Sequence, residues 1–316
     1  MKKNHAEAKS FLNYEYEEQT NYIKRFNKWL DRNIPFIFNL PTILFLFGLV
    51  TFPVCLVIIT SFTDWQLINK PDADFVGFHN FLIAWSDERW IHSIGHTFYY
   101  AVATVLGQFL IGMGTALLFN RSFAGKAFYR SIWMMPMISM SVAISLVWIL
   151  FFDPPYGVLN FWLNSMGLDS IDWTIEPNWA MPSLIIVGIW HHTPFMTLIL
   201  LAGLQSLPLD PFEAARIDGA SRWQVFVHVT LPLMRTHIVV ALVLRSIFGV
   251  KEFDTILAIT DAGPRWVTET MNLNIYFNAF EYQYMGEASA KGVIFFFIIL
   301  VIQLALLQMR KRKWSY

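Results

Sequence analysis

The residues best able to do chemistry lie in an unusual place, inside apolar stretches of the chain. Four charged residues fall within ten positions of one another in a single apolar run: Arg245, Lys251, Glu252 and Asp254. Two adjacent histidines, His191 and His192, lie in the preceding apolar run. An ionisable residue inside a membrane costs roughly 2.5–3.5 kcal/mol to insert, so it normally faces the bundle interior or a water-filled cavity. These residues therefore indicate a polar pathway for a solute.

Two other interpretations of the charged group remain open. Lys251 and Asp254 are three residues apart, so they could neutralise each other on one face of a helix. The residues from Lys251 to Asp254 could also lie at the outer end of their run, already half in water. A metal site is not expected at His191 and His192, because no cysteine, histidine or carboxylate stands at metal-ligand spacing from them.

The sequence lacks the motifs of the common enzyme classes. It has no phosphate-cradling glycine-rich loop followed by lysine, no zinc-binding spacing and no nucleophile elbow. We therefore expect no catalytic site, no metal and no cofactor in this chain, so active transport would draw on another subunit or on an ion gradient. Nucleic-acid binding is not expected either, because the polar loop described below carries only three basic residues.

The composition and the hydropathy pattern are those of a membrane protein. Hydrophobic residues make up 55% of the 316 residues and charged residues only 15%, whereas a soluble globular domain is about a quarter charged. Crossing about 30 Å of hydrocarbon takes about twenty helical residues. Six apolar runs are this long, near residues 36–62, 96–119, 130–151, 181–204, 236–258 and 288–309. Because lipid cannot satisfy an open sheet edge, we expect an all-α polytopic protein with six transmembrane helices.

The charges are sorted by side. Basic residues gather before the first span, between spans two and three, between spans four and five, and after span six. The opposite loops hold mainly acidic residues, with only Lys70, Arg89 and Arg265 among the basic ones. By the positive-inside rule, both termini and the loop between spans four and five are predicted to be cytoplasmic.

Two regions follow from this pattern. Residues 1–33 are predicted to form a cytoplasmic tail, in which residues 19–33 have the spacing of an amphipathic helix lying on the inner membrane surface. Residues 34–316 are predicted to form the transmembrane domain.

The loop at about residues 206–235 carries the local signals of two short helices. Asp210 to Glu213 reads as a capping box with Asp210 as the N-cap, and Gly219 supplies a stop because glycine tolerates the left-handed conformation. Ser221 to Gln224 repeats the capping box and opens a second helix, which should end before Pro232. A polar, doubly capped loop between two spans indicates a docking site for another protein. A connector that rests on lipid headgroups would have a similar sequence, so this alternative stays open.

The motifs in and around this loop resemble those of one transporter family. The loop reads Glu213-Ala214-Ala215-x-x-Asp218-Gly219-Ala220, followed by Leu231-Pro232, and it resembles the EAA loop of binding-protein-dependent ABC importer permeases. Further stretches resemble the sugar-importing branch, including Trp190-x-x-Thr193-Pro194-Phe195, Phe253-Asp254-Thr255-Ile256 and Gly286-x-Ala288-Ser289-Ala290. The resemblance covers about residues 36–310 and is greatest to the larger maltose- or glycerol-phosphate-transporter permease. One departure is Asp261-Ala262-Gly263-Pro264, where the branch usually has two or three glycines before the proline.

The resemblance implies a permease subunit of an importer in the bacterial cytoplasmic membrane, moving a sugar or sugar derivative. Its partners would be a second permease, two ATPase subunits that bind ATP and Mg, and an external sugar-binding protein that docks on the acidic outer loops. It implies that the ATPase is contacted by Glu213, Ala214, Ala215, Asp218, Gly219 and Ala220.

The resemblance also implies which residues meet the substrate. By position against the family's sugar-contacting residues, they would be His192, Phe195, Gly249, Lys251 and Glu252. The alternative function is a secondary transporter driven by an ion gradient through Lys251, Glu252 and Asp254, a class that usually shows inverted repeats.

Overall fold

The computed structural model describes residues 27–70 and 72–311. Within these residues the regular structure is helical, apart from two isolated β-bridges that join Thr63 to Phe75 and Gln66 to Lys70. The chain divides into two units, Met1–Ile59 and Thr60–Tyr316. The expectation of an all-α protein is thus confirmed for the described part of the chain.

The described part of the first unit is one long helix that ends just past the unit boundary. It runs over Asn27–Thr60, and none of the residues in its most apolar window is buried. A π-helical turn, η1 (Phe47–Thr51), precedes α2 (Phe52–Thr60). The wider turn fits Pro53, which has no N–H to donate and whose ring would crowd a regular turn. Residues 27–33 continue into the span without a break, while residues 19–26 of the predicted surface helix lie outside the described residues.

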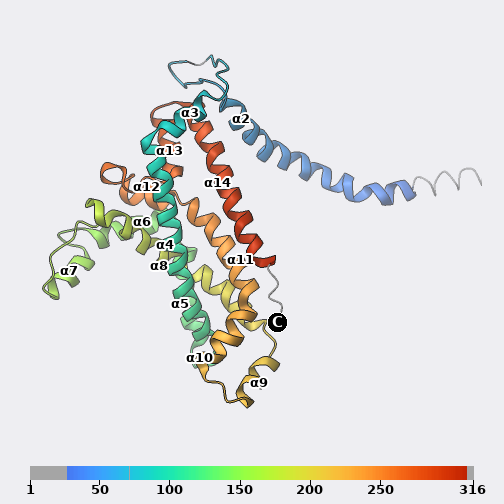
Figure 1. Ribbon diagram of the computed structural model, residues 1–316, viewed down its shortest axis with the longest axis vertical. Coiled ribbons are helices and arrows are strands. Elements are labelled where there is room, and N and C mark those ends of the chain that lie inside the picture. The colour runs from blue at the N-terminus through green and yellow to red at the C-terminus, as the bar shows by residue number, and fades with distance from the viewer. Residues whose placement is uncertain (1–26, 71, 312–316) are drawn as a thin grey trace, which may run out of the picture. The chain divides into compact units, whose positions relative to one another are not determined.

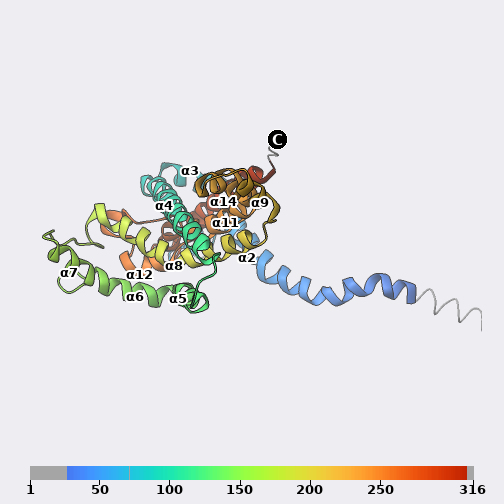
Figure 2. The same ribbon diagram turned by 90° about the horizontal axis from the view of Figure 1, so that it is seen from below.

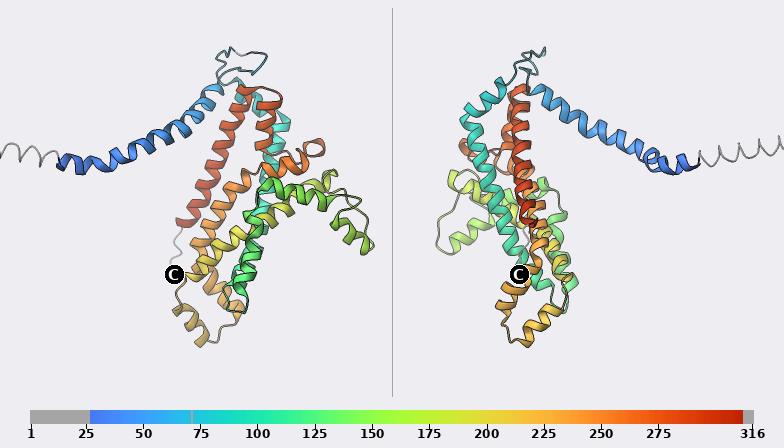
Figure 3. Two further views of the ribbon diagram at one scale, coloured as in Figure 1. Left: turned by 180° about the vertical axis from the view of Figure 1, so that it is seen from behind. Right: turned by 45° about the vertical axis from the view of Figure 1, so that its right-hand side comes forward.

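Four long helices form the body of the second unit (Figures 1 and 3). They are α4 (Glu88–Phe119), α8 (Pro177–Gln205), α11 (Leu231–Val250) and α14 (Met285–Lys311). α4 packs most extensively against α8, and α11 packs against α4, α8 and α14. All four are long and apolar enough to cross a membrane, which confirms a span in each of these four regions.

The third predicted span, 130–151, is not a straight helix. α5 (Lys126–Ile138) and α6 (Ser141–Phe152) meet at 98° across a short break. Pro136 lies inside α5, where its ring clashes with the preceding turn and removes a donor. The helix ends at Ile138, and the backbone of the next residue, Ser139, is extended. Figure 2 shows α5, α6 and then α7 (Val158–Ser165) following one another along the side of α8.

The fifth predicted span is shifted towards the N-terminus. The continuous helix runs over Arg222–Val250 instead of 236–258. The predicted stop before Pro232 is wrong, because a π-helical turn, η2 (Phe226–Thr230), carries the helix past the proline, with the Leu231 N–H donating to the Phe226 carbonyl. At the other end the helix stops at Val250.

Beyond Val250 the backbone breaks for three residues. Phe253 is non-helical, and α12 (Asp254–Thr260) starts separately. Lys251 and Glu252 therefore lie in a break between two helices. The suggested neutralisation of Lys251 by Asp254 on one helix face does not form, because no single helix includes both residues.

Short elements complete the end of the second unit opposite the loop 206–235 (Figure 1). They are α3 (His79–Ser86), η3 (Pro264–Trp266), α13 (Met271–Tyr276) and η4 (Phe277–Glu281). Three clusters of buried apolar side chains hold the unit together. Leu184 belongs to the cluster of α6, α8 and α12, Met196 to that of α4, α8 and α11, and Trp90 to that of α4, α13 and α14.

Candidate functional site

The loop between α8 and α11 forms the predicted pair of short helices, α9 (Asp210–Ile217) and α10 (Arg222–Val225). Gly219 has φ +72°, so the predicted left-handed stop is confirmed. The second capping box is also confirmed: the Ser221 N–H donates to Gln224 Oε1 at 2.7 Å, and the Gln224 N–H donates to Ser221 Oγ at 3.3 Å. Both features are local, because each involves groups no more than three residues apart.

The first predicted cap is wrong. Leu209 is the N-cap of α9, its backbone is helical, and no side chain caps the helix. The N–H groups of Phe212 and Glu213 both donate to the Leu209 carbonyl, at 2.9 and 3.1 Å. The helix therefore starts one residue early and includes Asp210 in its first turn, where a carboxylate still interacts favourably with the helix dipole.

The loop has a firm base and an exposed apolar tip. Leu207 and Phe226 pack onto the buried cluster of α4, α8 and α11. The side chains of Ile217 and Trp223 are 87% and 71% exposed. Large exposed apolar and aromatic side chains on a projecting loop suit the binding of another protein. In Figure 3, α9 and α10 lie at the end of the body away from α3 and α13.

The six residues predicted to meet a partner all lie on this loop. Four are exposed, namely Glu213, Ala214, Asp218 and Gly219, and two are half-buried, namely Ala215 and Ala220. A side chain added at Gly219 would meet nothing within 4 Å. The turn is therefore accessible from outside.

The break after α11 brings together three of the five predicted pathway residues. His192 on α8 lies opposite Glu252, with 3.5 Å between His192 Nε2 and Glu252 Oε2. Glu252 Oε1 also accepts a hydrogen bond of 2.7 Å from the Thr255 hydroxyl. Lys251 is exposed beside them. The carboxylate of Glu252 thus joins α8 to the broken end of span five.

The remaining two pathway candidates, Phe195 on α8 and Gly249 on α11, have different neighbours. The ring of Phe195, one turn from His192, meets the exposed ring of Phe248 edge-on at 6.3 Å between centroids. Gly249 is buried against α4, and a Cβ added there would lie 3.4 Å from Val105. Phe195 accordingly extends the polar pair with aromatic surface, whereas Gly249 serves close packing of the two helices.

A buried polar bridge that was not predicted ties three spans together behind this pair. Arg245 Nε donates to Gln108 Oε1 at 2.8 Å, and Gln108 Nε2 donates to the Gly188 carbonyl at 2.9 Å. Gly188 leaves room for Tyr100, since a Cβ there would lie 2.5 Å from the tyrosine hydroxyl oxygen. The available signal was a lone amide, Gln108, in an otherwise apolar run.

A second unpredicted cluster lies at the opposite end of the body from the loop. Arg89 Nε contacts Glu269 Oε2 at 2.6 Å, and Glu269 Oε1 accepts a bond of 2.6 Å from Asn274. Lys291 Nζ donates to Asn274 at 3.1 Å and contacts Asp87 Oδ2 at 2.6 Å. We call these five residues the outer network. They join α4, α13 and α14, and the signal in the sequence was Lys291 inside the last apolar run.

Burial and charge act in opposite directions on the two carboxylates of the outer network. Burial raises the pKa of Glu269, and the hydrogen bonds and charge of Arg89 only partly oppose this. Burial also acts to raise the pKa of Asp87, but the hydrogen bond and charge of Lys291 outweigh it, so the pKa of Asp87 lies below its usual value. The Arg89 guanidinium in addition stacks 4.5 Å from the centre of the Trp266 ring.

Known proteins share this architecture and much of this sequence. A family model described as binding-protein-dependent transport system inner membrane component matches residues 20–313. The chain is 32% identical to the sulfoquinovosyl glycerol transport system permease protein SmoG of Agrobacterium fabrum, over 92% of this chain and 96% of the relative. It is 33% identical to the trehalose/maltose transport system permease protein MalF of Thermococcus litoralis, over 75% of this chain and 82% of the relative.

A solved structure agrees with these relatives. It is the crystal structure of a bacterial alginate ABC transporter in complex with an alginate pentasaccharide-bound periplasmic protein. One of its chains matches with a TM-score of 0.79 and 25% identity, over 90% of this chain and 96% of that chain. The chain therefore belongs to the family of inner membrane components of binding-protein-dependent transport systems.

Proposed function

We propose that this chain is a permease subunit of an ATP-driven importer, and that the loop of α9 and α10 receives the movement of an ATPase subunit. The observation that carries this proposal is the firm base and exposed apolar tip of that loop in a chain of this family. A partner that binds the loop differently in two states would shift the spans between two arrangements. The chain would itself bind neither ATP nor Mg, which belong to the partner ATPases.

The charge pattern supports an orientation for the assembly. By the positive-inside rule, the loop of α9 and α10 and both chain ends would face the cytoplasm, because basic residues gather in these parts of the sequence. The outer network and the acidic loops would then face outward, where an external binding protein would deliver the substrate. The bound periplasmic protein in the alginate transporter structure supports this arrangement.

We further propose that the substrate is a saccharide or a saccharide derivative. The relatives named above are permeases for a sulfoquinovosyl glycerol and for trehalose or maltose. Phe195 offers an aromatic face, while His192, Lys251 and Glu252 offer charged groups for hydroxyls, the usual division of roles in a small-molecule site. A second permease would close the other side of the pathway. No comparison favours the alternative of an ion-driven secondary transporter.

The decisive test is ATP hydrolysis by the purified complex in lipid, with and without Gly219→Asp in this chain. The substituted side chain would project from an exposed turn with nothing within 4 Å, where the partner should dock. Gly167→Asp is a matched control, because Gly167 has φ +78° and equally open surroundings in a loop on the other side. Aspartate tolerates the left-handed conformation better than most residues, so both variants should assemble.

We expect Gly219→Asp to abolish the stimulation of hydrolysis by the sugar-loaded binding protein, while Gly167→Asp retains it. Assembly is checked by co-purification of all subunits. Unchanged stimulation in the Gly219→Asp complex would show that the loop is a passive connector.

A further inference from the structure

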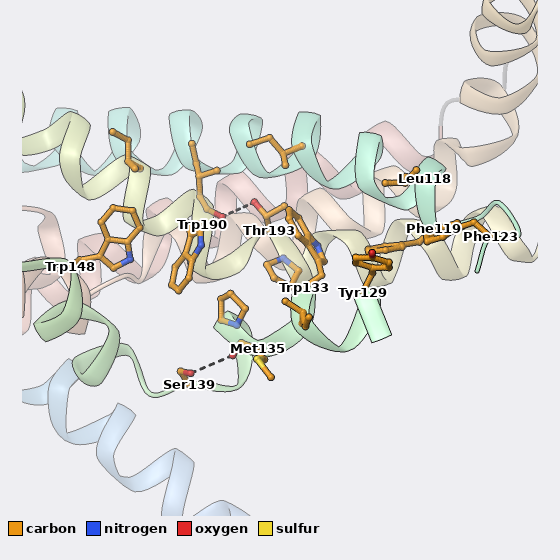
Figure 4. Close-up of a pocket in the computed structure, with 16 residues that line it drawn as sticks. Leu118, Phe119, Phe123, Tyr129, Trp133, Met135, Ser139, Trp148, Trp190 and Thr193 are labelled. Atoms are coloured by element: carbon orange, nitrogen blue, oxygen red, sulfur yellow. Dashed lines mark hydrogen bonds between the residues drawn. The ribbon is translucent and has the colours of Figure 1, made fainter. Parts of the chain in front are cut away.

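A large apolar cavity lies between α4, α5 and α8, apart from the proposed pathway. Its volume is about 1110 Å³. In Figure 4, Trp148 and Trp190 lie at one end of the cavity, and Phe123 and Tyr129 lie at the other. Two of the three hydroxyls in its wall are already engaged, since Thr193 donates to the Ile189 carbonyl at 2.6 Å and Ser139 to the Met135 carbonyl at 3.3 Å. The third, on Tyr129, lies at the end of the cavity with Phe123. Such a wall suits hydrocarbon and offers little to a sugar.

The cavity lies where α5 bends into α6. α5 has no fully buried residue along its length, and it reaches α8 through Trp133, whose Nε1 donates to the Thr197 hydroxyl at 3.2 Å. The cavity side of α5 presents Ile132, Trp133 and Pro136. At the depth of a membrane the surrounding solvent is lipid, so a cavity of this kind is open to acyl chains.

The segment of the chain beside one end of the cavity is basic. Arg121, Lys126 and Arg130 lie in and just after the turn that joins α4 to α5, and the sequence has no acidic residue between Glu88 and Asp153. Among the described residues, no ion pair or side-chain hydrogen bond involves these three basic side chains. Their positive charge is therefore uncompensated within the described chain.

In the sequence, the basic residues are neighbours of residues that line the cavity. Phe123 and Tyr129 line the cavity, and they alternate along the chain with the three cations. Lys126 and Arg130 themselves line a second hollow, of about 710 Å³, on the adjoining side of α5. Phe119, at the end of α4, packs in the same buried cluster as Phe226 of the loop base. The end of the cavity beside this basic segment thus lies at the end of the body where α9 and α10 project.

We propose that this cavity binds an anionic phospholipid, with an acyl chain between α4, α5 and α8 and the phosphate at Lys126 and Arg130. Basic pockets between transmembrane helices at the cytoplasmic interface select negatively charged headgroups. The apolar wall would contact the acyl chain of the lipid, and the uncompensated cations would contact its negatively charged headgroup. This inference rests on the membrane placement of the chain and on neither the sugar nor the ATPase assignment.

The test uses the complex purified by a tag on this chain and native mass spectrometry with two probes, phosphatidylglycerol and phosphatidylcholine. We expect retained phosphatidylglycerol and at least about a tenfold preference for it over phosphatidylcholine, since each basic residue near the surface contributes severalfold. The double variant Lys126→Gln/Arg130→Gln should lose about tenfold of this preference. The exposed pair Lys28→Gln/Arg32→Gln, in the first unit, is the matched control and should keep it.

A second variant tests the cavity independently of charge. Ile132→Trp adds bulk to the wall, and it should lower the retention of both lipids while size-exclusion chromatography shows an intact complex. Equal retention of the two lipids, or an unchanged preference in the Lys126→Gln/Arg130→Gln complex, would overturn the proposal. So would loss of the second permease from the Ile132→Trp complex, because the cavity would then be a protein interface. None of these readouts depends on ATP hydrolysis.

Discussion

Replacing Lys291 with methionine should destabilise the protein strongly, although it removes a charge from an apolar helix. The Lys291 side chain is only 1% exposed, and its Nζ lies 2.6 Å from Asp87 Oδ2. Methionine keeps the length of the side chain but leaves the carboxylate without its cation. Breaking a buried ion pair on one side costs about 3–5 kcal/mol. Asp87 is 29% exposed and can regain some water, so we expect a loss of about 3 kcal/mol.

A matched lysine in the same unit provides the comparison. Lys70 contacts Asp64 and, at 2.6 Å, Asp74, but its side chain is 38% exposed. Lys70→Met should therefore change the melting temperature little, because solvent screens exposed pairs. A loss of about 3 kcal/mol should lower the melting temperature by about 6–12 °C in Lys291→Met. Tryptophan fluorescence during heating of the protein in detergent measures both variants.

Equal shifts in Lys70→Met and Lys291→Met would refute the reasoning, because burial would then not decide the cost. A rise in melting temperature for Lys291→Met would refute it differently, by showing that apolar packing replaces the pair at no loss. The double variant Lys291→Met/Asp87→Asn separates the loss of the ion pair from the cost of leaving the Asp87 carboxylate without a cation. It should recover part of the loss, since the uncompensated carboxylate is removed.

Three further predictions follow from close contacts and charge. Gly112→Ala should destabilise by about 1–3 kcal/mol in chemical unfolding, because its Cβ would meet α8 at 2.9 Å, whereas Gly114→Ala, with open surroundings, should be neutral or slightly stabilising. Burial raises the pKa of Glu269, so its titration adds stability as the pH falls towards the ordinary value of 4.5 and loses it as the pH rises. Between pH 7 and pH 5, the melting temperature of the native protein should therefore rise relative to that of Glu269→Gln as the pH is lowered. A difference that stays constant with pH would contradict this. His192→Gln and Glu252→Gln should each reduce uptake in vesicles by about tenfold, and the double variant should lose little more, since the two side chains act as one pair; additive losses would show independent roles.

The features that the sequence predicted well are those set by local composition or by a few adjacent residues. Long apolar runs identify spans because the length needed to cross hydrocarbon is fixed. Gly219 and the Ser221–Gln224 box mark the turn and the start of α10 because each cap involves groups within three residues. Even here Asp210 failed as a cap, since the helix could start one residue earlier from Leu209.

The features that were missed depend on where helices bend and what they meet. Pro136 was visible, but a proline inside a span is often tolerated without a break, and nothing local indicates a 98° turn. The end of span five at Val250 is equally non-local. Glu252 has its partner 60 positions earlier in the sequence, at His192, so the spacing of neighbouring charges suggested the wrong pair.

The segment from the break in span five to α13 joins the two polar clusters into one system. Asn272 on α13 donates to the Lys251 carbonyl at 2.8 Å, and two residues later Asn274 belongs to the outer network. A buried polar network is costly to leave half-satisfied, so α13 should stay with α4 and α14 and hold the end of α11. The pair of His192 and Glu252 is longer, at 3.5 Å, and is an ion pair only when the histidine is protonated. We therefore expect a rearrangement that opens the pathway between α8 and α11 to begin at this pair and to leave the outer network intact.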